Sequence, residues 1–217
     1  MRMLPSRVAY DLWAESYPAT AHNPLMEAEQ RVVIERLRGI RATCALDVGS
    51  GSGRCVSLLA ATGATVTAVD LSMAMLRRNG HSRRVCSDAC SLPIASGSVD
   101  LVNASLMAGD IEALTPWLAE LARVLAPGGQ LLYSDFHSSW ATRGWQRTFR
   151  TPAGEECALP RAPHEISDHT DALIVAGFRV LAVDEIRLPA RGRRLLQLLK
   201  PRQEPVAVLF HAQKGEN

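Results

Sequence analysis

The chain has 217 residues, of which 47% are hydrophobic and 21% are charged, and its formal net charge is +2. This mix excludes an intrinsically disordered chain, and the length suits one well-buried domain rather than two of average size. The small charge gives no argument for a nucleic-acid partner, and no apolar run approaches the roughly 20 residues of a membrane span. Because the amino-terminal residues lack the apolar core of a signal peptide, we expect a cytoplasmic protein.

The segment before residue 44 predicts two amphipathic helices, a short one over 9–17 and a long one over 25–39. Neither belongs to the strand and helix alternation that follows. We interpret residues 1–43 as a helical lid on the single domain that spans 1–217.

From residue 44 onward, short β-branched runs alternate with helical patterns, which predicts a mostly parallel sheet covered on both faces. The predicted strands are 44–50, 64–71, 83–88, 100–106, 130–136, 179–188 and 205–214. The predicted helices are 54–62, 72–79, 110–126 and 167–177. Ser72 and Ser167 are the expected N-caps, and the glycines of "APGG" are expected to end the third helix. The last strand is expected to be antiparallel, because no clear crossover helix precedes it.

One segment departs from this pattern. Residues 138–166 hold five prolines and glycines between Gly144 and Pro163, and we interpret them as an inserted loop over the sheet, between halves at 44–137 and 167–217.

The five cysteines contain no C-x-x-C pair. Cys86 and Cys90 form a C-x3-C spacing with no second pair nearby, so we expect reduced thiols and no metal.

Three glycines follow the first predicted strand in "LDVGSGSGR", at Gly49, Gly51 and Gly53. A glycine turn at this point lets a ligand approach bare backbone, and Asp70 ends the next strand, where its carboxylate can accept hydrogen bonds from both hydroxyls of a ribose. A dinucleotide site needs G-x-G-x-x-G, and Arg54 stands where its third glycine would be. An adenosine-like ligand is therefore favoured over a nicotinamide or flavin, with a purely structural tight turn as the alternative.

The chain resembles the class I S-adenosylmethionine-dependent methyltransferases. Four ordered motifs carry the resemblance, at 46–54, 68–72, 87–105 and 121–135. The closest similarity is to the small-molecule branch that contains the quinone-biosynthesis methyltransferases and the malonyl-carrier-protein O-methyltransferases. The resemblance implies an α/β fold, a Rossmann-like doubly wound sheet of seven strands with an antiparallel last strand. It also implies S-adenosylmethionine as cofactor and S-adenosylhomocysteine as product.

The resemblance also implies roles for individual residues. Asp47 would brace the glycine loop, Asp70 would hold the ribose, Asp88 would accept from the adenine amino group, and Tyr17 would close the site from above. Residues 103–106 would line the floor beneath the sulfonium. The full implied cofactor set is Tyr17, Asp47, Gly49, Ser50, Gly51, Gly53, Asp70, Leu71, Met75, Asp88, Ala89, Asn103, Ala104 and Ser105.

Two motifs that are missing from the sequence narrow the range of possible acceptor classes. "NASLMAGD" after the fourth strand lacks the N/D-P-P-Y/F of adenine and cytosine amino methyltransferases, and no proline–cysteine nucleophile is present. Small-molecule or carrier-bound acceptors remain. His137, at the carboxyl end of the fifth strand, is the candidate base, because an imidazole titrates near neutral pH. The candidate acceptor contacts border or lie in the inserted loop: Trp140, Trp145, His164 and His169.

Residues 187–202 hold six basic residues and no acid. This stretch is either a solvated face or a docking surface for an acidic partner such as an acyl carrier protein. The docking hypothesis favours carboxyl O-methylation, with quinone-type C- or O-methylation and small-molecule N-methylation as alternatives. Two readings from other classes stay open, an NAD-dependent oxidoreductase and a non-catalytic subunit that only binds the cofactor.

Overall fold

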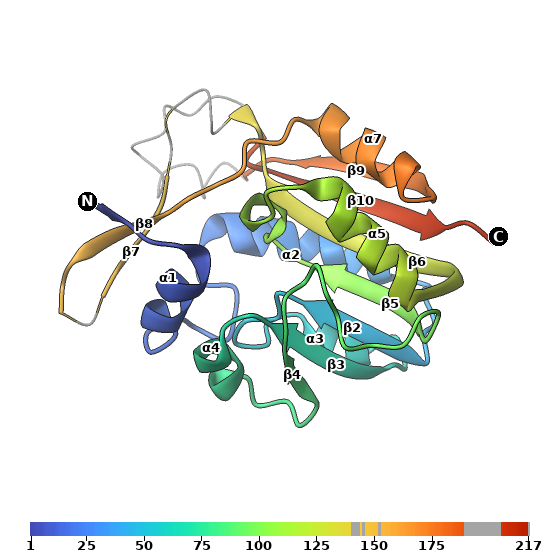
Figure 1. Cartoon of the computed structure of the whole chain (residues 1–217), viewed down its shortest axis with the longest axis horizontal. Helices are drawn as coiled ribbons and strands as arrows, with labels where there is room; N and C mark the ends of the chain where they lie inside the picture. The colour runs from blue at the N-terminus through green and yellow to red at the C-terminus, as the bar shows by residue number, and fades with distance from the viewer. Residues whose placement is uncertain (140–143, 145, 152, 189–204, 217) are drawn as a thin grey trace.

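A seven-stranded sheet forms the centre of the molecule in the computed structural model, which describes residues 1–139, 144, 146–151, 153–188 and 205–216 (Figure 1). The strand order is β4-β3-β2-β5-β6-β10-β9. The strands are β2 (Cys44–Val48), β3 (Thr65–Asp70), β4 (Arg84–Cys86), β5 (Val99–Ala104), β6 (Leu125–Phe136), β9 (Phe178–Ile186) and β10 (Ala207–Lys214). Every neighbouring pair from β4 to β6 is parallel, and β10 is antiparallel to both β6 and β9. The predicted sheet, including its antiparallel last strand, is confirmed.

Helices cover both faces because the buried strands are apolar on both sides. One face packs against α5 (Leu114–Val124) and α7 (Ile166–Val175), in a cluster that includes Trp117 and Tyr133. The other face packs against α2 (Pro24–Leu37) and α3 (Val56–Ala60), in a cluster that includes Val33 and Leu132. Leu132 and Tyr133 are neighbours on β6, so their opposite clusters follow from the alternation of side chains along a strand. Helix α4 (Met73–Arg78) follows β3 and contacts α1 (Ser6–Trp13).

A second, three-stranded sheet lies beside α1, on the left in Figure 1. It joins β1 (Arg2–Met3), β8 (Glu156–Leu159) and β7 (Arg147–Arg150), with β1 parallel to β8 and β7 antiparallel to β8. Trp13 of α1 stacks on Phe149 of β7 with ring centroids 5.0 Å apart, over a small core of its own. The interpretation of 138–166 as a loop is therefore wrong for this hairpin, which the chain's first residues complete.

The amino-terminal helices divide between two places. The first of them and the residues just after it border the central cavity described below, to which the second contributes Met26. Helix α2 packs on the main sheet, so the lid boundary at residue 43 extends too far. Helix α2 starts at a cap that the sequence analysis did not name, since the Asn23 side chain accepts from the Met26 N–H and Pro24 occupies the first turn.

Two helix boundaries also differ from prediction. A 3-10 turn, η1 (Ala108–Asp110), precedes α5, and Leu125 after α5 is already extended, so the "APGG" segment belongs to β6 instead of capping the helix. The N-cap of α7 is Glu165, whose capping box with Asp168 replaces the predicted Ser167 cap. The Ser72 cap of α4 is confirmed, because its hydroxyl accepts from the Met75 N–H.

Candidate functional site

A cavity of about 440 Å³ lies at the carboxyl ends of the central parallel strands, within the size range of small-molecule sites. Its walls come from the glycine turn after β2, the end of β3, the loop after β4, the segment after β5 and α1. Carboxyl ends of parallel strands share one edge, so motifs far apart in the chain meet there.

The glycine turn has three left-handed residues, with φ of +66° at Gly49, +53° at Gly51 and +95° at Gly53. A Cβ on Gly51 would meet no atom within 4 Å, so this backbone faces open space in the cavity. A Cβ on Gly53 would lie 2.6 Å from Asn79 Oδ1, and Gly53 does not line the cavity. Its expected cofactor contact is therefore corrected to close packing against the end of α4.

Asp47 lies beneath the turn and is only 2% exposed. It accepts hydrogen bonds from Ser50 Oγ at 2.7 Å and Asn103 Nδ2 at 2.8 Å. Burial raises the pKa of Asp47 to about 6, against the lowering effect of these two hydrogen bonds. Asn103 and Ala104 have no exposed surface, so the expectation that they line the floor is corrected: Ser105, Leu106 and Met107 line it instead.

Asp70 projects from the end of β3 and accepts from the Gly51 N–H at 2.7 Å and the Ser72 N–H at 2.8 Å. Burial raises the pKa of Asp70, and these backbone donors oppose the shift. Each oxygen keeps a second lone pair for a ligand hydroxyl.

Beyond Asp70, the expected adenine contacts lie along one wall of the cavity: Leu71, Met75, Asp88 and Ala89. Met75 is buried within α4, whereas Leu71 is 42% exposed. The Asp88 carboxylate accepts from the Cys90 N–H at 2.8 Å, a local turn that fixes the acid at the cavity edge.

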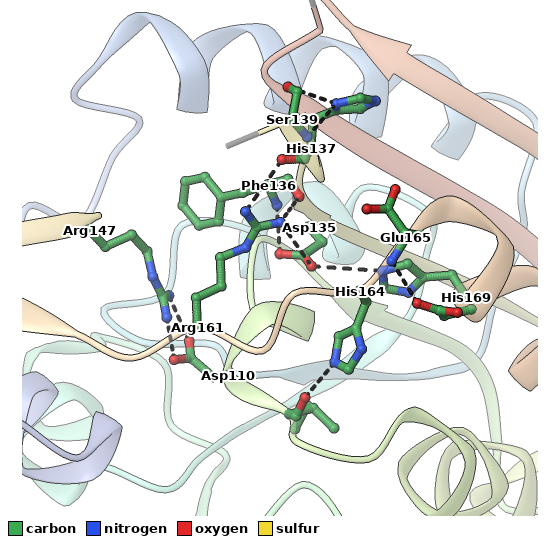
Figure 2. A network of polar contacts seen from close by, with 12 residues as sticks. Asp110, Asp135, Phe136, His137, Ser139, Arg147, Arg161, His164, Glu165 and His169 are labelled. Carbon is green, nitrogen blue, oxygen red and sulfur yellow. Dashed lines mark hydrogen bonds and ion pairs between the residues drawn. The ribbon is translucent and has the colours of Figure 1, made fainter. Parts of the chain in front are cut away.

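On the opposite side, Asp110 joins α1 and the hairpin to the main sheet. It accepts from Ser6 Oγ at 2.7 Å and from Tyr10 OH at 3.1 Å. It also accepts from the Arg147 guanidinium, whose Nη1 lies 2.8 Å away, a contact that Figure 2 shows. Burial, followed by the charge of Asp110, raises the pKa of Tyr10 well above its usual range. Burial likewise raises the pKa of Tyr17, which also lines the cavity. Both phenols therefore stay protonated at neutral pH.

The histidines expected at the site do not line this cavity. His137 turns toward β9, with Nδ1 3.0 Å from Ser139 Oγ and Nε2 3.3 Å from Glu185 Oε1. The structure therefore places the candidate base outside the cavity. Figure 2 shows it apart from Asp110, on the far side of Arg161.

The two histidines of the 164–169 segment are also held away from the cavity. His164 Nε2 lies 2.7 Å from the Ile111 carbonyl oxygen, and the buried His169 lies between Tyr133 and Asp135. Both expected acceptor contacts therefore lie outside the cavity, where they contact other residues of the protein. Trp140 and Trp145 lie outside the described residues, as does nearly all of the basic stretch 187–202.

Sequence reasoning missed a buried ion pair behind the glycine turn. The Glu29 carboxylate on α2 is fully buried and lies 2.8 Å from Arg54 Nη1, and Arg54 lines the cavity. A signal for it exists in the sequence: Leu25, Glu29, Val33 and Leu37 recur every four residues, so an acid interrupts the apolar stripe of a predicted helix. A charge in that stripe indicates a buried partner.

Comparison with known proteins places these features in a family. The model of a methyltransferase domain matches residues 46–133. The chain is 33% identical over 167 residues to a demethylmenaquinone methyltransferase of Mycolicibacterium gilvum, covering 75% of this chain and 71% of that protein. It is 38% identical over 110 residues to the biotin biosynthesis bifunctional protein BioHC of Cellvibrio japonicus, covering 47% of this chain and 22% of that protein.

Other curated relatives are covered less fully, since the chain spans 40%, 62% and 55% of three further demethylmenaquinone methyltransferases. Among solved structures, an S-adenosylmethionine dependent methyltransferase from Mesorhizobium loti shares the fold with a TM-score of 0.70 and 20% identity, over 86% of this chain and 98% of that one. No helix in the described residues has the length and apolarity needed to cross a membrane.

Proposed function

Since the chain belongs to the class I S-adenosylmethionine-dependent methyltransferases of the small-molecule branch, we propose that its acceptor is a carboxylate on a small or carrier-bound molecule. The enzyme class and the predicted cofactor follow from family membership. The cofactor's placement and the acceptor are the proposal.

The residues around the cavity suit the cofactor. Gly51 leaves room for a ligand where a side chain would project into the cavity. Asp70 offers two fixed carboxylate oxygens, and it ends the strand after the glycine turn, where a ribose-binding acid is expected. We place the adenine between Met75 and Ala89 and the amino-acid part against Gly49, Ser50 and Gly51. When bound, the cofactor supplies a methyl group on a positively charged sulfur, which a carboxylate oxygen attacks without first losing a proton.

The acceptor proposal rests on one observation: the described groups at the α1 side of the cavity are poorly suited to act as a general base. Among the described residues at the α1 side of the cavity, Tyr10 and Tyr17 stay protonated, and Asp110 is already paired with Arg147. The histidines point elsewhere. An acceptor that arrives ionised needs no general base, and alignment alone can supply effective molarities of about 10⁵ to 10⁸ M. The resemblance to malonyl-carrier-protein O-methyltransferases and the match to a biotin biosynthesis protein support the same choice.

A second candidate is methylation of a reduced quinone ring. It is favoured by the match to a demethylmenaquinone methyltransferase over 75% of this chain. A ring hydroxyl must lose a proton for this reaction, and Asp110 is one of the described carboxylates that line the cavity.

Alkali distinguishes the two candidates. The enzyme is incubated with S-adenosylmethionine labelled in its methyl group and with a malonyl-carrier protein, malonyl-coenzyme A or a short-chain demethylmenaquinol. A methyl ester releases labelled methanol on mild alkaline treatment, whereas a methyl group on carbon does not. Alkali-labile label on either malonyl substrate is the expected result. Stable label on the quinol alone would replace the carboxylate proposal by the second candidate, and label on none of the three would refute both.

A further inference from the structure

We propose that Arg54 binds the carboxylate of the cofactor's amino-acid part, and that Glu29 is the positioning residue that holds the Arg54 guanidinium there. The inference rests on the cofactor placement proposed above. It assigns a role to a buried acid on α2, a helix that packs on the sheet and lines the cavity through Met26.

Glu29 is held on both of its oxygens. Oε2 lies 2.8 Å from Arg54 Nη1, and Oε1 accepts from Ser134 Oγ at 2.7 Å. The side chain has no exposed surface, and its neighbours at helical spacing, Leu25 and Val33, are apolar. A buried carboxylate with both oxygens engaged has one orientation, so it fixes its partner as well.

Arg54 is engaged on one side only. Its Nη1 contacts Glu29 and, at 3.4 Å, Gln30 Oε1; in the described part of the chain, no other residue accepts a hydrogen bond from it. A guanidinium has five N–H donors, and neither Nε nor Nη2 is among the described polar atoms that are buried without a partner. These donors therefore face the cavity that Arg54 lines. Burial lowers the pKa of Arg54, but the charge and hydrogen bond of Glu29, together with Cys55 and Tyr17, outweigh this and the pKa is raised, so the charge persists.

Most charged side chains that line the described cavity walls are acids, so the positively charged Arg54 guanidinium differs from its surroundings. The acids along the described walls are Asp47, Asp70, Asp88, Asp110 and Glu112. Such a cavity attracts a sulfonium and an ammonium but repels a carboxylate, unless a cation stands beside it. The described lining cations are Arg54, which directly follows the glycine turn, and Arg7, which lies on α1. A carboxylate on the ligand part that lies against the turn therefore meets Arg54.

The same acid also supports the cavity floor. Ser134, which donates to Glu29, accepts from the Leu106 N–H at 2.8 Å. Leu106 has a φ of +56°, a left-handed conformation found at no other non-glycine residue in the described chain. Such conformations persist where surrounding contacts hold them. Glu29 thus connects the Arg54 side of the cavity to the floor residue at the end of β5.

Two nucleosides test the assignment by calorimetric titration. S-adenosylhomocysteine carries the amino-acid part, whereas 5′-methylthioadenosine has the same adenosine and a thioether but no carboxylate. The ratio of the affinity for S-adenosylhomocysteine to the affinity for 5′-methylthioadenosine therefore isolates the contribution of the amino-acid part with its carboxylate. We compare wild type, the double variant Arg54→Gln with Glu29→Gln, and Glu29→Asp. The double variant leaves no unpaired buried charge, and Glu29→Asp keeps the charge but shortens its reach.

The double variant is expected to lose roughly 10- to 100-fold in affinity for S-adenosylhomocysteine, the value of a charge-assisted hydrogen bond, with methylthioadenosine changed less than about twofold. Glu29→Asp should lower the ratio by several-fold through misplacement alone. The control is Arg36→Gln on the same helix, which breaks the ion pair between Arg36 and Asp184 of β9. Neither residue lines the cavity, so the ratio should stay unchanged.

An unchanged ratio in the double variant would overturn the assignment of Arg54. A lowered ratio there with a wild-type ratio in Glu29→Asp would overturn the positioning role of Glu29. If wild type bound neither nucleoside, the cofactor placement itself would fail, which separates that failure from the failure of this inference.

Discussion

Replacing Asp47 by asparagine is expected to stabilise the protein at neutral pH. Asp47 is 2% exposed, and its pKa is raised from 3.8 to about 6 because burial disfavours the charged form. A carboxyl whose pKa is higher in the folded state binds its proton more tightly there. The folded state is therefore destabilised by this group as the pH rises from about 4 through 6, and the penalty is complete above that range.

The size of the expected stabilisation follows from the shift in the pKa of Asp47. A difference of about 2 pK units at about 1.36 kcal/mol each amounts to roughly 3 kcal/mol of unfolding free energy that the wild type loses between pH 4 and 7. Asparagine keeps an oxygen for the Asn103 Nδ2 donor. The Ser50 hydroxyl loses its acceptor, which costs about 1 kcal/mol. The net gain for Asp47→Asn at pH 7.5 is about 2 kcal/mol.

Urea unfolding from pH 4 to 8 measures this effect. The variant should be slightly less stable than wild type at pH 4 and more stable at pH 7.5. Glu120→Gln is the control of opposite sign, because the hydrogen bond from Arg123 lowers the pKa of Glu120. Its contribution is present at neutral pH and fades in acid, so Glu120→Gln should lose stability at pH 7.5. An Asp47→Asn variant less stable than wild type at pH 7.5, with an unchanged pH slope, would refute the reasoning.

Three further substitutions test the roles assigned to individual residues. Asp70→Asn should weaken S-adenosylhomocysteine binding by about 10-fold or more in calorimetry, because the ribose loses a charged acceptor; equal affinity would remove the ribose from Asp70. Asp110→Asn should speed amide hydrogen exchange in α1, since the Ser6 and Arg147 contacts weaken, while α5 serves as the unaffected reference. Exchange unchanged in α1 would show that its small apolar core holds the helix without the acid. His137→Ala should leave methyl transfer within about twofold of wild type, and a large loss would restore it to the reaction.

The sequence by itself determined the sheet and the part of the cavity wall that the glycine turn and Asp70 form. A glycine turn after one strand and Asp70 at the end of the next are local features, and parallel strands bring their carboxyl ends to one edge whatever the rest of the chain does. The Ser72 cap is local as well. These features lie in one stretch of the chain, between Gly49 and Ser72, so their geometry can be derived from spacing.

Only the tertiary structure decided the other half. The distance from Glu29 to Arg54, or from Asp110 to Arg147, depends on how a helix or hairpin docks on the sheet, and hydrophobic periodicity reports which face is buried without naming the partner. His137 shows the same limit. Its position after β6 was right, but its ring turns toward Glu185 of β9, a strand that β10 separates from β6. The pairing of β1 with β8 joins residues more than a hundred positions apart, and such contacts leave no pattern in a single sequence.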